Sequence, residues 1–293
     1  MTVSAEQREQ VVASAIREIS HIATLPEITL KIIDLVEDPS STAQDLHQII
    51  SNDPALCSRI LKVVNSSFYG LPGQIASINR AIVMLGLNAV KNIAIAASLA
   101  KLFRGGDLTP SFSAKDLWTH SNATAAACKL ICSELGLGLG DEAYLAGLIH
   151  DIGVMVEMQY DRNKLIETVE LCAPDADGVP QVNMLDAEDK VFGANHCDFG
   201  TALCDKWKFP ATFAVVTKFH HIPAEAPSES RTIVSIVHVA DRIAAEVAGG
   251  FRLDLSDLEI DKTALETLGL DDSKLANVRE KLTEAIESMD TSL

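Results

Sequence analysis

Apolar residues recur at helical spacing along most of the chain, and this pattern predicts helices almost throughout. The segment 26–38 repeats apolar positions every three or four residues, as an amphipathic helix does. The segment 51–65 predicts a helix with Asp53 as its N-cap and Pro54 at the first helical position. The segment 88–103 is apolar on nearly every side, so we expect it to be a core helix.

The helical pattern continues in the second half of the chain. It predicts five further helices, over residues 113–135, 141–160, 199–209, 210–221 and 231–249. The Gly-Leu-Gly-Leu-Gly stretch at 136–140 follows no predicted strand and precedes no Walker lysine, so we interpret it as a turn between helices. The C-terminal stripe can pack back on the body or form a dimer seam, and we favour packing on the body for Leu275, Val278, Leu282, Ile286 and Met289.

Two stretches rich in Gly, Ser and Pro interrupt the helices. Residues 65–77 are expected to form an ordered loop that holds Phe68 and Tyr69. Residues 104–113 join two long helical runs through Gly-Gly and Pro, and they are the best candidate boundary. The chain is therefore divided into an N-terminal helical region, a helical bundle and an acidic helical extension, at residues 1–108, 109–250 and 251–293.

Composition agrees with an all-α protein and limits its partners. Apolar residues make up 47% of the chain and aromatic residues only 5%, which is typical of packed helices rather than of a sandwich or barrel. The formal net charge is −17, from 24 basic and 41 acidic side chains, and this disfavours nucleic acid and anionic membranes as partners. We therefore expect a multi-helix bundle that binds neither.

The cysteines and the N-terminus indicate a cytoplasmic protein. The six cysteines form no Cys-x-x-Cys pair and most lie among apolar neighbours, as buried, reduced thiols do. The N-terminus has no positive start followed by an apolar core, and the longest apolar stretches fall far short of about 20 residues.

Seven polar residues lie on, or at the ends of, the apolar helices of the second half. They are His120, His150, Asp151, His196, His220, His221 and Asp241. Burying an imidazole or a carboxylate there is costly unless a partner is present. Imidazole and carboxylate together are ligands for iron, manganese, nickel or zinc, and a shared Asp151 can bridge two ions. The sequence thus predicts one or two divalent ions, although any single histidine is more often a core or surface residue.

Local spacing adds two suggestive pairs. Asp116 and His120 are four residues apart, and His238 and Asp241 are three apart, so each pair can project from one helical face. In the second pair, one of the two residues can be a spacer that does not bind the ion.

The order of these residues resembles a known family. His120, His150-Asp151 and Asp241 match the H…HD…D pattern of the HD superfamily of all-helical, metal-dependent phosphohydrolases. The segments LPEITLKIIDLVEDP, NSSFYG…INRAIVMLG and AYLAGLIHDIGVMV resemble the HDOD domain, an HD-related output domain of bacterial signalling proteins. The resemblance covers roughly residues 20–245 and implies an HD-like fold in the second half.

The resemblance also implies which residues hold which ion. His196, His220 and His221 match the additional histidines of the related HD-GYP phosphodiesterases, which cleave cyclic di-GMP, and Asp116 matches an extra acidic ligand in some of them. By this resemblance, one ion is held by His120, His150, Asp151 and Asp241, and the other by Asp151, His196, His220 and His221.

Two departures from the HD-GYP pattern weigh against catalysis. Val154 stands where those enzymes carry a lysine near the phosphate, and the residues after His221 contain no Gly-Tyr-Pro loop. Lys218 and Arg242 lie near expected ligands, but we interpret both as solvated cations on helix faces.

The expected function is therefore that of a bacterial signalling or regulatory protein with a metal centre. It would act on a signalling protein partner or a small nucleotide-like ligand, and a homodimer is open. The alternative is a metal-dependent phosphohydrolase for a nucleotide or cyclic dinucleotide, in which Asp151 is the catalytic residue. A third interpretation makes the ion a structural staple that holds the helices together.

Overall fold

The computed structural model describes residues 4–19, 27–38, 40–65, 69, 71–103, 107–176, 178–248 and 250–288. Its first helices are α1 (Ala5–Glu18), α2 (Glu27–Glu37), α3 (Ala43–Ser51), α4 (Pro54–Val64), α5 (Ile78–Leu85), α6 (Leu87–Leu99) and the 3-10 helix η1 (Ala100–Phe103). A short antiparallel hairpin follows, formed by β1 (Asp107–Thr109) and β2 (Phe112–Ser113). The rest of the chain is again helical: α7 (Ala114–Glu134), α8 (Gly140–Ile149), α9 (Ile152–Tyr160), α10 (Arg162–Cys172), α11 (Met184–Val191), α12 (His196–Lys206), α13 (Ala211–Phe219), η2 (Pro223–Glu225), α14 (Arg231–Val247), α15 (Lys262–Leu268) and α16 (Asp272–Ser288).

Side-chain caps begin several of these helices. Asp53 accepts a hydrogen bond from the backbone N–H of Leu56, with Pro54 at the first helical position, so the predicted start of α4 is confirmed. Ser113 and Asp116 form a capping box at the start of α7.

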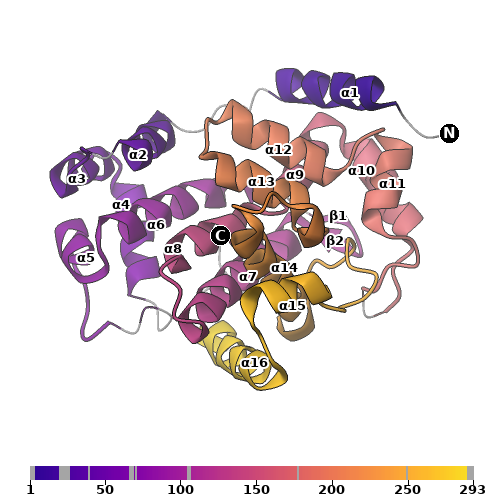
Figure 1. Ribbon diagram of the computed structural model, residues 1–293. Helices are drawn as coiled ribbons and strands as arrows, with labels where there is room; N and C mark the ends of the chain where they lie inside the picture. The colour runs from indigo at the N-terminus through magenta and orange to yellow at the C-terminus, as the bar shows by residue number, and fades with distance from the viewer. Residues whose placement is uncertain are drawn as a thin grey trace.

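The bundle is built around α7. Figure 1 shows α7, α8 and α14 in the centre of the molecule, with α9, α12 and α13 beside them and α2 to α6 forming a lobe at one side. The helices α8, α14 and α16 pack against α7, and α6 connects the lobe to the bundle through its contact with α8. The all-α prediction is confirmed, and so is packing of the C-terminal stripe on the body, because Leu275, Val278 and Leu282 are buried. Met289 lies outside the described residues.

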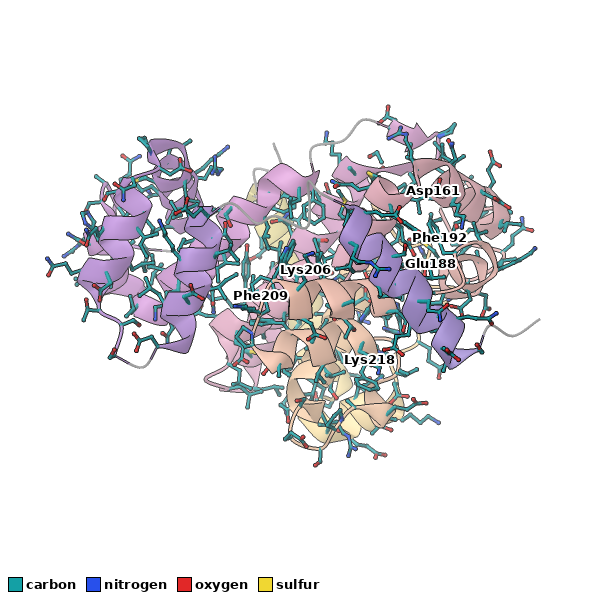
Figure 2. All side chains as sticks on the ribbon, turned by 90° about the horizontal axis from the view of Figure 1, so that it is seen from above. Asp161, Glu188, Phe192, Lys206, Phe209 and Lys218 are labelled. Carbon is teal, nitrogen blue, oxygen red and sulfur yellow. The ribbon has the colours of Figure 1, made fainter. Side chains whose placement is uncertain are left out.

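The first helix packs on the second half of the chain. In Figure 2, α1 runs past Glu188 and Lys206, and it contacts α12 and α9. Arg8 on α1 forms ion pairs with Asp189 and Asp198, at 2.8 and 2.6 Å. The division of the chain at residue 108 stays a prediction, since helices from both sides of it pack together.

One sequence prediction about local structure was wrong. The segment 141–160 is not one helix: it is broken at His150 and Asp151 into α8 and α9. The apolar pattern continues on both sides of His150 and Asp151, so periodicity did not predict a break there. Within the candidate boundary, residues 107–113 form the hairpin, whose Phe112 is buried against Phe251, and the boundary itself stays a prediction.

The predictions of free cysteines and of a turn at residues 136–140 agree with the structure. All six cysteines are free, and five of them are buried. Residues 136–140 connect α7 to α8 as expected. Within the described ranges, no helix has the length and apolar character needed to cross a bilayer.

Candidate metal centre

The break between α8 and α9 places His150 and Asp151 side by side in the centre of the bundle. His150 is the C-cap of α8, and Asp151 precedes the first residue of α9. Gly153 follows, and a Cβ atom at this position would overlap the backbone carbonyl of His196. The glycine therefore lets α9 approach the start of α12 closely enough to bring His196 to Asp151.

A first group of ligand atoms comes from α7, α8 and α14. His120 Nε2 lies 3.0 Å from Asp241 Oδ1, and His150 Nε2 lies 3.1 Å from Asp151 Oδ2. His150 Nε2 is also 3.7 Å from Asp241 Oδ1, and His120 Nε2 is 3.9 Å from Asp151 Oδ2. Two ligands of one ion, each about 2.1 Å from it, lie about 3 to 4 Å apart. These four distances fit that range, and His120, His150 and Asp241 offer ligand atoms that all lie within 4.8 Å of one another.

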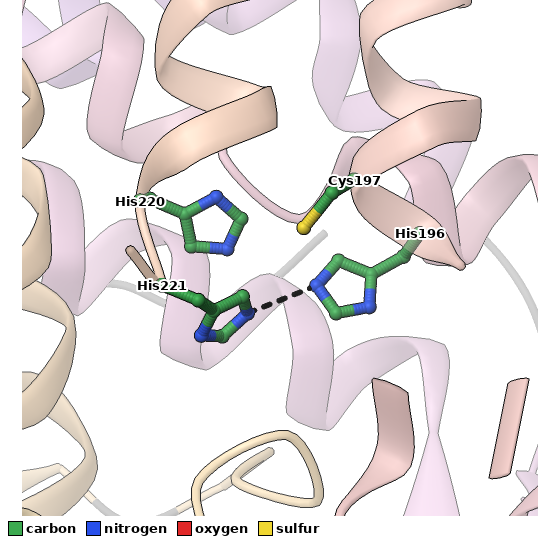
Figure 3. A group of neighbouring side chains, drawn as sticks. All are labelled: His196, Cys197, His220 and His221. Carbon is green, nitrogen blue, oxygen red and sulfur yellow. Dashed lines mark hydrogen bonds between the residues drawn. The ribbon is translucent and has the colours of Figure 1, made fainter. Parts of the chain in front are cut away.

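A second group uses the other oxygen of Asp151. Asp151 Oδ1 lies 3.3 Å from His220 Nε2 and 3.7 Å from His196 Nε2. His196 Nε2 and His221 Nε2 face each other at 3.1 Å, as Figure 3 shows. The structure therefore brings together all seven residues that the sequence singled out, in two groups that share Asp151.

Three of the histidines are held by Nδ1 and direct Nε2 into the centre. His150 Nδ1 lies 2.7 Å from the carbonyl of Gly147, and His220 Nδ1 lies 3.0 Å from the carbonyl of Thr217. His196 Nδ1 lies 2.9 Å from the carboxylate of Glu188. Metal-binding histidines typically donate their other ring N–H to a carbonyl or carboxylate in this way.

Several of the ligand atoms are buried without a hydrogen-bond partner, which is the test of whether metal ions fit here. Within the described chain these atoms include His150 Nε2, His220 Nε2 and both oxygens of Asp151. Leaving such groups unpaired costs about 1 to 3 kcal/mol each, and more for charged groups. Nitrogen and oxygen donors of this kind are what a divalent ion requires. The His and Asp groups can therefore hold a metal.

The ionisation of the centre also calls for positive charge. Burial disfavours protonation of His150, but the carboxylates of Asp151 and Asp241 outweigh it and raise the pKa of His150 well above its usual value. Burial alone would raise the pKa of Asp151, but His150, His220 and His196 lower it well below the usual range. Without metal, protons on histidines balance these carboxylates.

One further acidic residue belongs to the second group and was missed from the sequence. Asp254 lies between α14 and α15, is 2% exposed, and has Oδ2 at 3.4 Å from His221 Nε2. Together with Asp151 and the three histidines it offers a set of mutually close ligand atoms. The sequence carries one signal, because Asp254 stands between two leucines in the stretch 251–255.

Two residues from the suggestive pairs lie elsewhere. The carboxylate of Asp116 accepts hydrogen bonds from the backbone N–H and hydroxyl of Ser113, so it caps α7 and does not join the cluster. His238 is the spacer of its pair. Its Nδ1 lies 2.7 Å from the carbonyl of His220, and its Nε2 accepts from the backbone N–H of Asp261 at 3.0 Å.

Three further residues considered in the sequence can now be placed in the structure: Arg242, Lys218 and Tyr69. Arg242 is not a solvated cation, because it is 9% exposed and donates to the carbonyls of Glu259 and His238. The ammonium group of Lys218 lies 5.5 Å from the ring centre of Phe219. Tyr69 is half-buried, with the ammonium group of Lys129 at 4.0 Å from its ring centre, whereas Phe68 lies outside the described residues.

Comparison with known proteins agrees with this architecture. The HDOD domain profile matches residues 22–223. An uncharacterized protein of Treponema pallidum is 28% identical over 240 residues, which cover 80% of this chain and 44% of the relative, so the chain spans less than half of that relative's length.

Solved structures share the fold. An HDOD domain protein of Geobacter sulfurreducens with unknown function has a TM-score of 0.74 at 24% identity, covering 96% of this chain and 99% of that one. A candidate phosphohydrolase of Shewanella amazonensis has a TM-score of 0.71 at 22% identity, covering 94% and 97%. At these identities the likeness establishes the fold.

Proposed function

The chain belongs to the HDOD family, and from this premise we propose that it is a bacterial regulatory protein with a two-ion His/Asp centre as a fixed part of its fold. In this proposal it acts on a signalling protein partner or a small nucleotide-like ligand. His120, His150, Asp151 and Asp241 hold one ion, while Asp151, His196, His220 and His221 hold the other.

The observation that carries the proposal is the burial of the centre within the protein. The six predicted ligands other than His221 are at most 1% exposed. The side chain of His221 is 10% exposed and lines a surface pocket of about 390 Å³. A hydrolytic centre needs an open position for its substrate, whereas these groups are enclosed by protein.

The charge of this pocket also disfavours a phosphate substrate. Its wall carries three carboxylates against two cationic side chains, namely Asp257, Glu259, Asp261, Arg242 and Lys262. The guanidinium group of Arg242 is already engaged by two backbone carbonyls. Val154, which stands where related phosphodiesterases carry a lysine, is fully buried.

Phosphohydrolysis remains the second candidate because Asp151 directs one oxygen to each group of ligands. Divalent ions bound in such a pair of sites polarise a phosphoryl oxygen and lower the pKa of bound water. In that case Asp151 would hold both sites in register, and the Nδ1 contacts of His150 and His220 would keep their Nε2 atoms directed at the centre.

Metal content and turnover together test the proposal. Protein purified without an affinity tag is analysed for metals beside an Asp151→Ala sample, and both are assayed with bis(p-nitrophenyl) phosphate and cyclic dinucleotides. We expect close to two ions per chain in the wild type and none in Asp151→Ala. The metal-loaded wild type should melt at a higher temperature than the metal-free protein. Its rate of hydrolysis should not exceed that of Asp151→Ala. Absence of any ion, even after addition of iron, manganese, nickel or zinc, would refute the metal centre. Turnover that disappears in Asp151→Asn would replace the regulatory function with the hydrolytic one.

A further inference from the structure

We propose that Asp254 is an additional ligand of the second ion, and that its coordination fastens the segment after α14 over the centre. The inference rests on the proposed two-ion centre and extends its set of ligands. Asp254 lies beyond residues 22–223, the part of the chain that matches the family profile.

The position of the Asp254 side chain points to an ion rather than to a protein partner. Its carboxylate is buried, and neither oxygen has a hydrogen-bond partner in the described structure. The neighbouring polar atom is His221 Nε2, at 3.4 Å from Oδ2, and His221 is itself directed at His196. A buried carboxylate without donors is stabilised by a proton or by a cation, and the ligand atoms of Asp151 and the three histidines gather around a position where a cation can contact Asp254.

Backbone and apolar contacts fix Asp254 in this position. The carbonyl of Leu253 accepts from the N–H of Met184, and the carbonyl of Asp254 accepts from the side-chain amide of Asn183, at 3.1 and 2.9 Å. Leu253 and Leu255 are each 2% exposed. The segment is therefore anchored on both sides of Asp254. These contacts fix its backbone and direct the carboxylate toward the interior.

The same segment covers the first group of ligands. The ring of Phe251 lies edge-on to His120, with ring centres 6.0 Å apart, and packs against Phe112 of the hairpin. An ion held by Asp254 would thus connect the segment 250–261 to α9, α12 and α13.

Charge balance favours the same assignment. Two divalent ions carry four positive charges, while Asp151 and Asp241 supply two negative ones. Asp254 supplies a third within an interior where uncompensated charge is costly. It would also occupy a coordination position that a substrate needs, in agreement with a closed centre.

The test compares Asp254→Asn with Asp257→Asn, which removes an exposed carboxylate three residues further along the same segment. Zinc affinity of each metal-free protein is measured by competition with a chromogenic chelator, and hydrogen exchange of residues 250–261 is followed with and without zinc. We expect wild type and Asp257→Asn to bind two zinc ions and to gain protection over 250–261. Asp254→Asn should bind the second ion at least about tenfold more weakly and gain little protection there.

The metal-free proteins control for folding. Because Asp254→Asn replaces a buried carboxyl group that has no hydrogen-bond donor by an amide of the same shape, its metal-free form should fold and melt no lower than metal-free wild type. If Asp254→Asn binds both ions with wild-type affinity and gains the same protection, Asp254 is not a ligand, although the two-ion centre stands. If the wild type binds no zinc, the centre and the role of Asp254 are refuted together.

Discussion

Glu188 lies directly behind His196 and determines which of its ring nitrogens faces the centre. The Glu188 carboxylate accepts from His196 Nδ1 at 2.9 Å and from the His196 backbone N–H at 3.0 Å, and both residues are fully buried. A carboxylate in this position orients the ring and makes its Nε2 a stronger metal ligand. Burial and the adjacent charge of Glu188 raise the pKa of Glu157 well above its usual value.

The first prediction concerns this contact. Glu188→Gln should weaken the second zinc site by about 10- to 100-fold and leave the first site unchanged, because His120, His150 and Asp241 make no contact with Glu188. Competition titration of the two sites measures the effect, with Asp186→Asn, an exposed carboxylate on the same helix, as the control. Equal loss at both sites would indicate general disruption instead of misorientation of His196.

Close approach of α9 and α12 leads to the second prediction. Since a Cβ at Gly153 would overlap the carbonyl of His196, Gly153→Ala should separate the two helices and lower the free energy of unfolding by about 1 to 3 kcal/mol. It should also move His196 away from Asp151 and lower zinc affinity. At Gly140 a Cβ meets only ordinary contacts, so Gly140→Ala should change stability by no more than about 1 kcal/mol. Both variants are compared by urea unfolding and zinc titration. Losses confined to Gly153→Ala would support the effect on helix spacing, whereas equal losses in Gly140→Ala would contradict it.

The third prediction is release of protons on metal binding. Nearby carboxylates raise the pKa values of His150 and His196 against the opposing effect of burial, so these histidines carry protons in the metal-free protein at neutral pH. A metal binds only the neutral ring, and zinc affinity should therefore rise with pH and fall on acidification. Calorimetric titration in two buffers of different ionisation enthalpy should detect at least one released proton per chain. Fewer protons are expected from Glu188→Gln, since Glu188 contributes to the raised pKa of His196; identical heats in both buffers would contradict the prediction.

The sequence predicted much of the centre because its members differ sharply from their apolar surroundings. His120 and Asp241 are polar residues within buried helices. The resemblance to HD proteins assigned the ligands to two ions, which spacing alone does not do. Local spacing could not separate Asp241 from His238, which lies on the same helix. The distinction comes from the packing of α13 against α14, which places the carbonyl of His220 against the ring of His238.

Other features depend on contacts that the linear pattern does not record. Asp254 alternates with apolar residues, a pattern that normally places the polar side chain in solvent, but here protein packs on both sides of the segment. Glu188 occupies a short helix with an ordinary amphipathic pattern, and only its contact with His196 gives it a role.

His238 provides the last prediction, which concerns stability against pH. Burial and the nearby charge of Arg242 lower the pKa of His238 from its ordinary 6.5 to about 4, against the opposing effect of its hydrogen bond to the His220 carbonyl. The neutral ring donates from Nδ1 to that carbonyl and accepts at Nε2 from the backbone N–H of Asp261. The unfolded chain therefore binds a proton between pH 6.5 and 4 that the folded chain does not. This difference lowers the free energy of unfolding as the pH falls through that range, by about 3 kcal/mol in total.

The variant His238→Gln removes this titration and keeps an acceptor near the position of Nε2. Metal-free wild type and His238→Gln are unfolded with urea at several pH values between 7 and 4, so that protonation of the histidine ligands contributes equally to both. The variant should be less stable at pH 7, because it loses the donor to His220, yet the gap should narrow or reverse toward pH 4. His47→Asn on α3, outside the bundle, serves as the control, because it removes a histidine and keeps both contacts of His238. Parallel curves for wild type and His238→Gln would show that burial does not keep His238 neutral in the folded protein.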